Sequence, residues 1–294
     1  MGDLMNRMME RFATDPAGGF ATFVDDLAQM EGPALQGVEV SLAEERRQGA
    51  KARLEYLEKA RAQGYRVVDD PARLAYLRAL VDRLAKRMVH RDRYAAIDVT
   101  LIDAPAADGQ SFPGGSLVFT TGLLKEPDEA TVVGVVAHEL AHLDRGHMYD
   151  VVRREKLAQD SFRGPFGAGA TFDEMFTRQA ALFGMMMRPF RPEQEHEADC
   201  TAATWMFQEG YDPQALMGFF ERLHRRRNDA PGVEIPFFNF ARTHPYSLDR
   251  RDHVRARLRQ LQAWRPRRDL GLYPENLKDL RPKEAEPGKE GDKK

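Results

Sequence analysis

A valine-rich stretch in the middle of the chain places the strongest constraint on the fold. Residues 130–137 read Ala-Thr-Val-Val-Gly-Val-Val-Ala, and residues 138–142 read His-Glu-Leu-Ala-His. Pro127 suits the first position of a helix, and the two acidic residues after it suit the positive end of the helix dipole. We therefore expect a buried helix that runs to about Gly146, around which the other elements must pack.

Composition limits the class of protein. The 294 residues correspond to one large domain or two small ones, and 42 % hydrophobic residues are too many for a disordered chain. A net charge of -2 argues against a nucleic-acid binder. No run approaches the roughly 18 consecutive apolar residues that span a membrane. The single cysteine, Cys200, excludes an intramolecular disulfide framework and a cysteine-rich zinc module.

Hydrophobic periodicity, with glycine stops and proline starts, predicts the other elements. Short helices are expected before residue 42, and strands at 95–102 and 116–121, the second strand after a Pro-Gly-Gly turn. Besides the valine-rich helix, the predicted helices cover 42–63, 71–90, 192–209 and 213–226, and further helices begin near 171 and 247. The pattern indicates an α+β fold that is predominantly helical, with a small sheet.

The end of the valine-rich helix carries the residues with chemistry. His138 and His142 are four residues apart and therefore lie on one face, where two imidazoles can reach one zinc ion. Glu139 lies beside that position and can take a proton from a zinc-bound water. The alternative is a helix in which both histidines have only structural partners.

A catalytic zinc site needs a third protein ligand. The pattern HExxHxxGxxH fails because Arg145 and Met148 stand where glycine and histidine are required, and His147 is displaced by one residue and predicted to point elsewhere. A later helix offers Glu195 and Asp199, which are four residues apart on one face.

The same helix also contains rival ligands. Ala198 and Ala202 are small enough to let it approach the first helix closely. Glu193, His196 and Glu197 remain alternatives to Glu195, although a regular helix turns them away from the face that holds Asp199.

Several motifs resemble those of one peptidase family. The chain resembles the M48 zinc metallopeptidases, in their soluble, Oma1-like bacterial branch. The resemblance covers roughly residues 65–260 and rests on ordered motifs: His-Glu-Leu-Ala-His at 138–142, Glu-His-Glu-Ala-Asp at 195–199, Thr-His-Pro at 243–245 followed by Arg250, Phe-Pro-Gly-Gly at 112–115 and Thr-Gly-Leu-Leu at 121–124.

The resemblance implies a zincin-type (gluzincin) fold with the sheet beside the first zinc helix. It implies that Glu195 is the third ligand and that Asp199 orients a zinc-bound imidazole. His244 is expected near the metal, either stabilising the oxyanion or binding zinc as an inhibitory fourth ligand; a structural histidine before Pro245 is the alternative. Arg250 is expected to pair with Asp199 or with transition-state charge, unless it is a plain surface arginine.

These features predict a metalloendopeptidase with one Zn²⁺ per chain that cleaves unfolded or misfolded polypeptides. The strand at 116–121 is expected to be an edge on which an extended peptide pairs, with 161–170 and 185–190 as candidate lid segments. The rival is a latent or chaperone-like zinc protein whose site His244 blocks. No nucleic-acid partner and no transmembrane segment are expected, and the oligomeric state is not predicted.

The sequence divides into three regions. We expect an N-terminal helical extension over 1–64, an M48 catalytic domain over 65–265 and a flexible tail over 266–294.

The N-terminus lacks a basic region followed by an apolar one, although a trimmed signal peptide leaves no trace. The compartment is the periplasm or cell envelope if such a signal was removed, and otherwise the cytoplasm.

Overall fold

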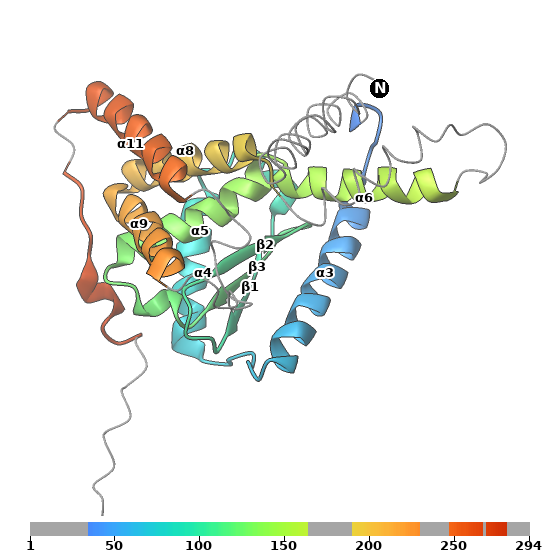
Figure 1. Cartoon of the computed structure of the whole chain (residues 1–294), viewed down its shortest axis with the longest axis horizontal. Coiled ribbons are helices and arrows are strands. Elements are labelled where there is room, and N and C mark those ends of the chain that lie inside the picture. Colours follow the sequence, from blue (N-terminus) through green and yellow to red (C-terminus); the bar gives the residue numbers. More distant parts are fainter. Residues whose placement is uncertain (1–34, 164–189, 230–246, 267–268, 281–294) are drawn as a thin grey trace, which may run out of the picture.

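The computed structural model describes residues 35–163, 190–229, 247–266 and 269–280 (Figure 1). Its α-helices are α3 (Leu42–Ala62), α4 (Pro71–Ala85), α5 (Glu129–Asp144), α6 (His147–Arg163), α8 (Pro192–Glu209), α9 (Gln214–Asp229) and α11 (Ser247–Trp264). The strands are β1 (Asp98–Ile102), β2 (Gly109–Phe112) and β3 (Ser116–Thr120), and the 3₁₀ turns are η1 (Arg91–Tyr94), η2 (Leu123–Lys125) and η3 (Pro274–Leu277). This confirms the predicted α+β, predominantly helical fold with a small sheet.

Helix α5 lies at the centre of the molecule, and all of its residues are buried. Its N-terminus is capped by Asp128, whose carboxylate accepts a hydrogen bond from the backbone N–H of Thr131 at 2.8 Å. Helices α4, α8 and α9 pack against it, and β2 lies against another side (Figure 1). Gly134 lets α8 and α9 pack tightly on α5 at this point, because a Cβ there would lie 3.2 Å from side-chain atoms of Met206 and Leu216.

The sheet has the strand order β1-β3-β2. Strands β1 and β3 are parallel, whereas β2 pairs antiparallel with β3. The strand predicted at 116–121 therefore lies in the centre, and the expectation that it is an open edge is wrong. The edge beside α5 is β2, a four-residue strand that was not predicted from the sequence.

Helix α3 is attached to the sheet through a buried carboxylate. Glu45 accepts hydrogen bonds from the guanidinium of Arg93, the hydroxyl of Tyr94 at 2.7 Å and the backbone N–H of Gly114 at 3.0 Å. Gly49 faces the same turn, where a Cβ would clash with the carbonyl of Pro113. The residues of α3 thus hold the turn that joins β2 to β3.

Residues 269–280 pack against α5 and the loop before α9. Gly271 forms a bridge with Tyr211, and the side chains of Leu277 and Leu280 are buried in the main core. The amide of Asn276 donates to the carboxylate of Glu129 at 2.6 Å. The sequence pattern did not foresee this packing; the division into an extension, a catalytic domain and a tail stays a prediction.

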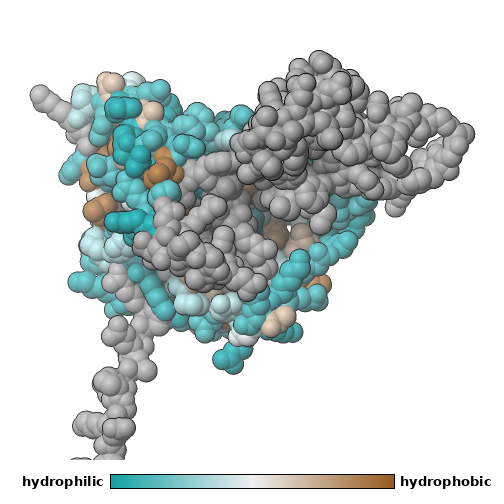
Figure 2. All heavy atoms as spheres, in the orientation of Figure 1, coloured by the Kyte–Doolittle hydropathy of each residue, from teal (hydrophilic) through white to brown (hydrophobic). Residues whose placement is uncertain are grey.

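Within the described ranges, no helix is long and apolar enough to cross a membrane. Figure 2 shows that the described residues on this face are mostly hydrophilic, with a few hydrophobic side chains among them. The exposed large hydrophobic residues are Leu54, Val67, Val89, Trp264, Leu272 and Tyr273.

Candidate metal centre

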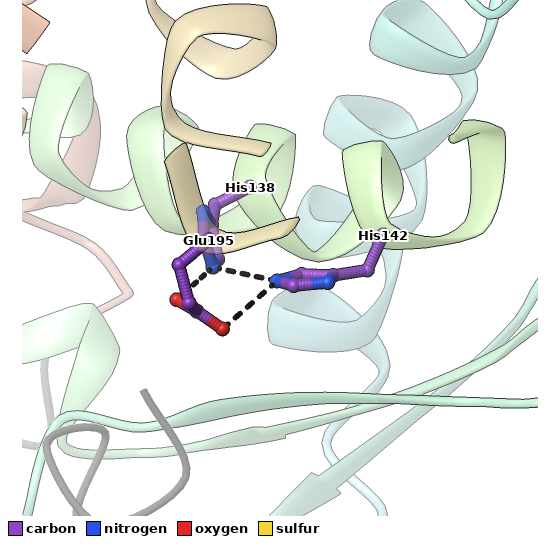
Figure 3. Close-up of side chains that lie close together, drawn as sticks. All are labelled: His138, His142 and Glu195. Carbon is purple, nitrogen blue, oxygen red and sulfur yellow. Dashed lines mark hydrogen bonds and ion pairs between the residues drawn. The ribbon is translucent and has the colours of Figure 1, made fainter. Parts of the chain in front are cut away.

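Two imidazoles from α5 converge at the centre of the fold. His138 and His142 are fully buried, and their Nε2 atoms lie 2.9 Å apart. One helical turn separates them, so both rings project from the same face of α5 toward the space beside the sheet (Figure 3).

A carboxylate from α8 completes the cluster. Pro192 is the first residue of this helix. The Gln194 side chain accepts a hydrogen bond from the backbone N–H of Arg191 at 3.1 Å, which fixes the first turn. Glu195 lies in that turn, with its two carboxylate oxygens each 3.6 Å from one imidazole Nε2. The buried Ala198 and Ala202 lie on α8, where their small size allows the close contact between α8 and α5.

The three side chains point toward one another (Figure 3). One donor atom from each of His138, His142 and Glu195 lies within 4.8 Å of the others, so the group can hold a metal ion. Imidazole nitrogen and carboxylate oxygen are both ligands of divalent metal ions, and Cys200 lies outside the cluster.

A chain of hydrogen-bonding groups lies behind His138. Asp199 Oδ1 is 3.0 Å from Nδ1 of that imidazole, and Asp199 is fully buried. A carboxylate in this place fixes the tautomer that leaves Nε2 as the donor atom facing the cluster.

Arg250 holds this carboxylate from the other side. Its Nε donates to Asp199 Oδ2 at 2.8 Å and its Nη2 donates to Oδ1 at 2.7 Å, while Nη1 lies 3.3 Å from Glu195. The guanidinium also lies over the ring of Phe220 at 4.2 Å. Arg250 is 2 % exposed, which rules out a plain surface arginine. Burial lowers the pKa of Arg250, but the nearby carboxylates of Asp199 and Glu195 raise it by more than burial lowers it. The pKa therefore lies above its ordinary value, and the side chain stays charged.

Glu139 lies beside the cluster and is fully buried. Its Oε2 accepts a hydrogen bond from the backbone N–H of Ser111 at 2.7 Å. Because Ser111 belongs to β2, the edge strand that the sequence did not predict fixes the carboxylate of this residue.

The remaining candidates have different positions. Glu193, His196 and Glu197 are exposed and lie outside the cluster. His147 does not point away as expected, because its Nδ1 lies 3.0 Å from Nδ1 of His142. His244, residues 185–189 and most of 161–170 lie outside the described residues.

Comparisons with known proteins agree with this arrangement. The model of Peptidase family M48 matches residues 71–258, more than half of the chain. The chain is 26 % identical over 155 residues to the mitochondrial metalloendopeptidase OMA1 of Arabidopsis thaliana, covering 50 % of this chain and 29 % of that protein. It is 26 % identical over 208 residues to the beta-barrel assembly-enhancing protease of Escherichia coli (strain K12), covering 67 % and 41 %.

A third relative is the mitochondrial metalloendopeptidase OMA1 of Schizosaccharomyces pombe, which is 26 % identical over 191 residues, or 63 % of this chain and 52 % of that protein. The chain thus spans about half the length, or less, of these relatives. The family match and the buried His-His-Glu group together support a metal-dependent peptidase. On this evidence the chain belongs to peptidase family M48.

Proposed function

We propose that this protein is a zinc metalloendopeptidase that holds one Zn²⁺ per chain on His138, His142 and Glu195. The observation that carries the proposal is the buried convergence of two imidazoles and a carboxylate beside Glu139. Ligands on a tetrahedral zinc ion at about 2.05 Å stand about 3.3 Å apart. The two Nε2 atoms lie 2.9 Å apart, each lies 3.6 Å from a different oxygen of the Glu195 carboxylate, and one ligand atom from each residue lies within 4.8 Å of the others, so a single zinc ion could be reached by all three side chains.

Each residue has a defined part in the proposed reaction. A zinc ion held by these residues would supply Lewis-acid polarisation and would lower the pKa of a water molecule on it to about 7. Glu139 is the general base: its carboxylate takes a proton from the attacking water and delivers it to the leaving amine. The hydrogen bond from the backbone N–H of Ser111 to Oε2 holds this carboxylate beside the cluster.

Asp199 and Arg250 act behind the ligands in this proposal. Asp199 orients the His138 imidazole, and Arg250 keeps Asp199 in place and offsets the negative charge of Glu195. We assign Arg250 a positioning part, because its guanidinium is engaged by two carboxylates. His244 is proposed near the oxyanion on the strength of the family resemblance alone.

We propose unfolded polypeptide as the substrate, bound in extended form. Strand β2 supports this, since it is an edge of the sheet and its Ser111 contacts Glu139. Pairing along such an edge uses backbone hydrogen bonds and therefore tolerates many sequences. The peptide would then lie on β2, rather than on the central strand β3.

The first experiment measures cleavage of casein by the purified full-length chain. Wild-type protein should cleave it, lose activity in 1,10-phenanthroline and recover when zinc is restored. Glu139→Gln should keep one zinc per chain and lose about a hundred- to ten-thousandfold in kcat/KM, which is the usual contribution of general acid–base catalysis. Cleavage by Glu139→Gln at the wild-type rate would contradict the mechanism.

A second experiment separates the enzyme from a latent zinc protein, which the family evidence does not favour. If wild-type protein is inert and His244→Ala cleaves casein, the latent alternative is correct.

A third experiment compares cleavage of one globular protein in its native form with cleavage of a destabilised variant of the same protein. The proposal expects cleavage of the destabilised form alone, and equal cleavage of both would contradict the proposed substrate class.

A further inference from the structure

The second imidazole of the cluster also has a chain of partners behind it. His147 Nδ1 lies 3.0 Å from Nδ1 of His142, and His147 Nε2 lies 3.3 Å from Glu197 Oε2. The His147 side chain is 3 % exposed, whereas Glu197 is 52 % exposed. We call His147 and Glu197 the His142 arm, and Asp199 and Arg250 the His138 arm.

A break between two helices places His147 there. Gly146 has a φ of 75°, a left-handed conformation that ends α5, and α6 begins at the next residue. The chain turns at this point, so that the His147 ring comes back beside His142 with 5.0 Å between ring centroids. The ring of Phe190 covers the face of His142 at 3.8 Å. His142 is thus held on its face by an apolar ring and at its Nδ1 by a polar one.

The direction of the hydrogen bonds follows from which atom faces the cluster. His142 presents Nε2 to His138 and Glu195, so as a metal ligand it carries its hydrogen on Nδ1. That hydrogen is donated to Nδ1 of His147, and the hydrogen of His147 then lies on Nε2. This Nε2–H donates to the carboxylate of Glu197, and every polar atom of the arm has one consistent role.

We propose that His147 and Glu197 are positioning residues for His142, which fix its ring and tautomer and strengthen zinc binding. The inference rests on the proposed function, since it takes His142 as a zinc ligand. Partners of this kind behind a metal ligand typically contribute 10–100-fold to metal affinity.

The two arms differ in their surroundings. The His138 arm ends in a buried guanidinium, whereas Glu197 borders an open hollow of about 350 Å³ that Arg145 and His253 also line. Arg145 Nε lies 3.7 Å from Glu197, at a position that is itself partly exposed. Water screens the outer end of the His142 arm, so that we expect Glu197 to matter less than His147.

The test measures the zinc dissociation constant by competition with a chromogenic chelator. His147→Leu should weaken zinc binding ten- to a hundredfold, because Nδ1 of His142 loses its acceptor. His147→Asn should recover most of the affinity, since its side-chain oxygen can occupy the place of Nδ1 and accept the same hydrogen bond. Glu197→Gln should weaken zinc binding by less than His147→Leu does, because water screens this end of the arm. The matched control Glu193→Gln, an exposed residue on the same helix, should match the wild type.

Cobalt-substituted protein gives a second readout that does not depend on cleavage. The visible absorption bands of Co²⁺ should shift in His147→Leu and return toward the wild-type spectrum in His147→Asn. If His147→Leu does not fold, the Asn variant and Glu197→Gln decide the matter. The proposal is overturned if the folded Leu variant binds zinc as tightly as the wild type, or if the Asn variant binds zinc as weakly as the folded Leu variant. Without a folded Leu variant, wild-type zinc affinity in Glu197→Gln together with a tenfold or greater loss in the Asn variant would overturn it.

Failure of the proposed function looks different. If wild-type protein binds zinc and responds to these substitutions but cleaves no polypeptide, the arm is real and the peptidase assignment is wrong. If Glu195→Gln binds zinc as tightly as the wild type, the proposed metal centre itself is wrong.

Discussion

The two ends of α5 both carry buried polar groups, but they are built differently. At the N-terminal end, the carboxylate of Glu129 accepts hydrogen bonds from Tyr76 at 3.1 Å, Tyr211 at 2.9 Å and Asn276 at 2.6 Å. These three donors are neutral, and Tyr211 in turn accepts a hydrogen bond from the guanidinium of Arg83 at 2.5 Å. This end joins α4, the loop before α9 and the C-terminal residues to one point on α5.

At the C-terminal end of α5, the atoms that could bind a metal ion face one another. The imidazole Nε2 atoms and the Glu195 carboxylate converge, and Arg250 is the buried cation beside them among the described residues. Burying such a group without a positive charge at its centre costs free energy of folding. The Glu129 carboxylate is thus satisfied by hydrogen-bond donors of the protein itself, whereas the histidine end is arranged so that it could hold a metal ion.

The largest effect is expected at Arg250. In chelator, Arg250→Leu should lower the free energy of unfolding by about 3–5 kcal/mol, because Asp199 and Glu195 would be left as buried carboxylates without a compensating charge. Urea denaturation followed by circular dichroism measures this. Arg251→Leu, the next residue along α11, should unfold like the wild type; equal losses in both variants would show that the buried ion pairs carry no special weight.

A smaller effect is expected at the other end of the helix. Glu129→Gln replaces one acceptor oxygen with a donor group that faces donors, which should cost about 1–3 kcal/mol of unfolding free energy. The zinc dissociation constant should not change, since the substitution lies more than two helical turns from His138. Glu275→Gln, an exposed neighbour, is the control. A large loss of zinc affinity in Glu129→Gln would mean that the two ends are coupled.

The smallest effect concerns alkaline pH. Burial raises the pKa of Tyr211 to about 12 against the opposing effect of Arg83, while the unfolded chain has the ordinary value of 10.0. The neutral hydroxyl is therefore favoured in the folded state, and its contribution is present below pH 10 and lost as the pH rises toward 12. Unfolding free energy should fall there by at most about 1.4 kcal/mol per pH unit for this group.

Tyr211→Phe should make this decline shallower between pH 10 and 12 without altering zinc binding. Stability curves of the two proteins that run parallel across that range would show that Tyr211 does not titrate as described.

The histidine pair could be predicted from spacing within one helix, whereas the choice of Glu195 over its rivals was implied by the resemblance to the M48 family. His138 and His142 share a face on any regular helix, and so do Glu195 and Asp199 on theirs. The partners of these residues could not be predicted in the same way. Strand β2 is a Gly-Gln-Ser-Phe segment with no hydrophobic run, and it becomes a strand only through pairing with β3.

His147 illustrates the same limit. Its position depends on the left-handed turn at Gly146, whereas helical periodicity assumes that α5 continues. The stretch 269–280 has no periodic pattern, and its burial depends on two leucines, Leu277 and Leu280, that meet the core after a long path. Local spacing thus predicts the residues that gather on one helix face, and tertiary contacts decide what holds them.

The central claim is that Glu195 completes a zinc site with the two histidines of α5. The direct measurement is zinc per chain, by elemental analysis after dialysis, in Glu195→Gln and in Glu193→Gln, two substitutions on the same turn of α8. We predict one zinc per chain in Glu193→Gln and in the wild type, and far less than one in Glu195→Gln. Full zinc occupancy in Glu195→Gln, or its loss in Glu193→Gln, would contradict the account.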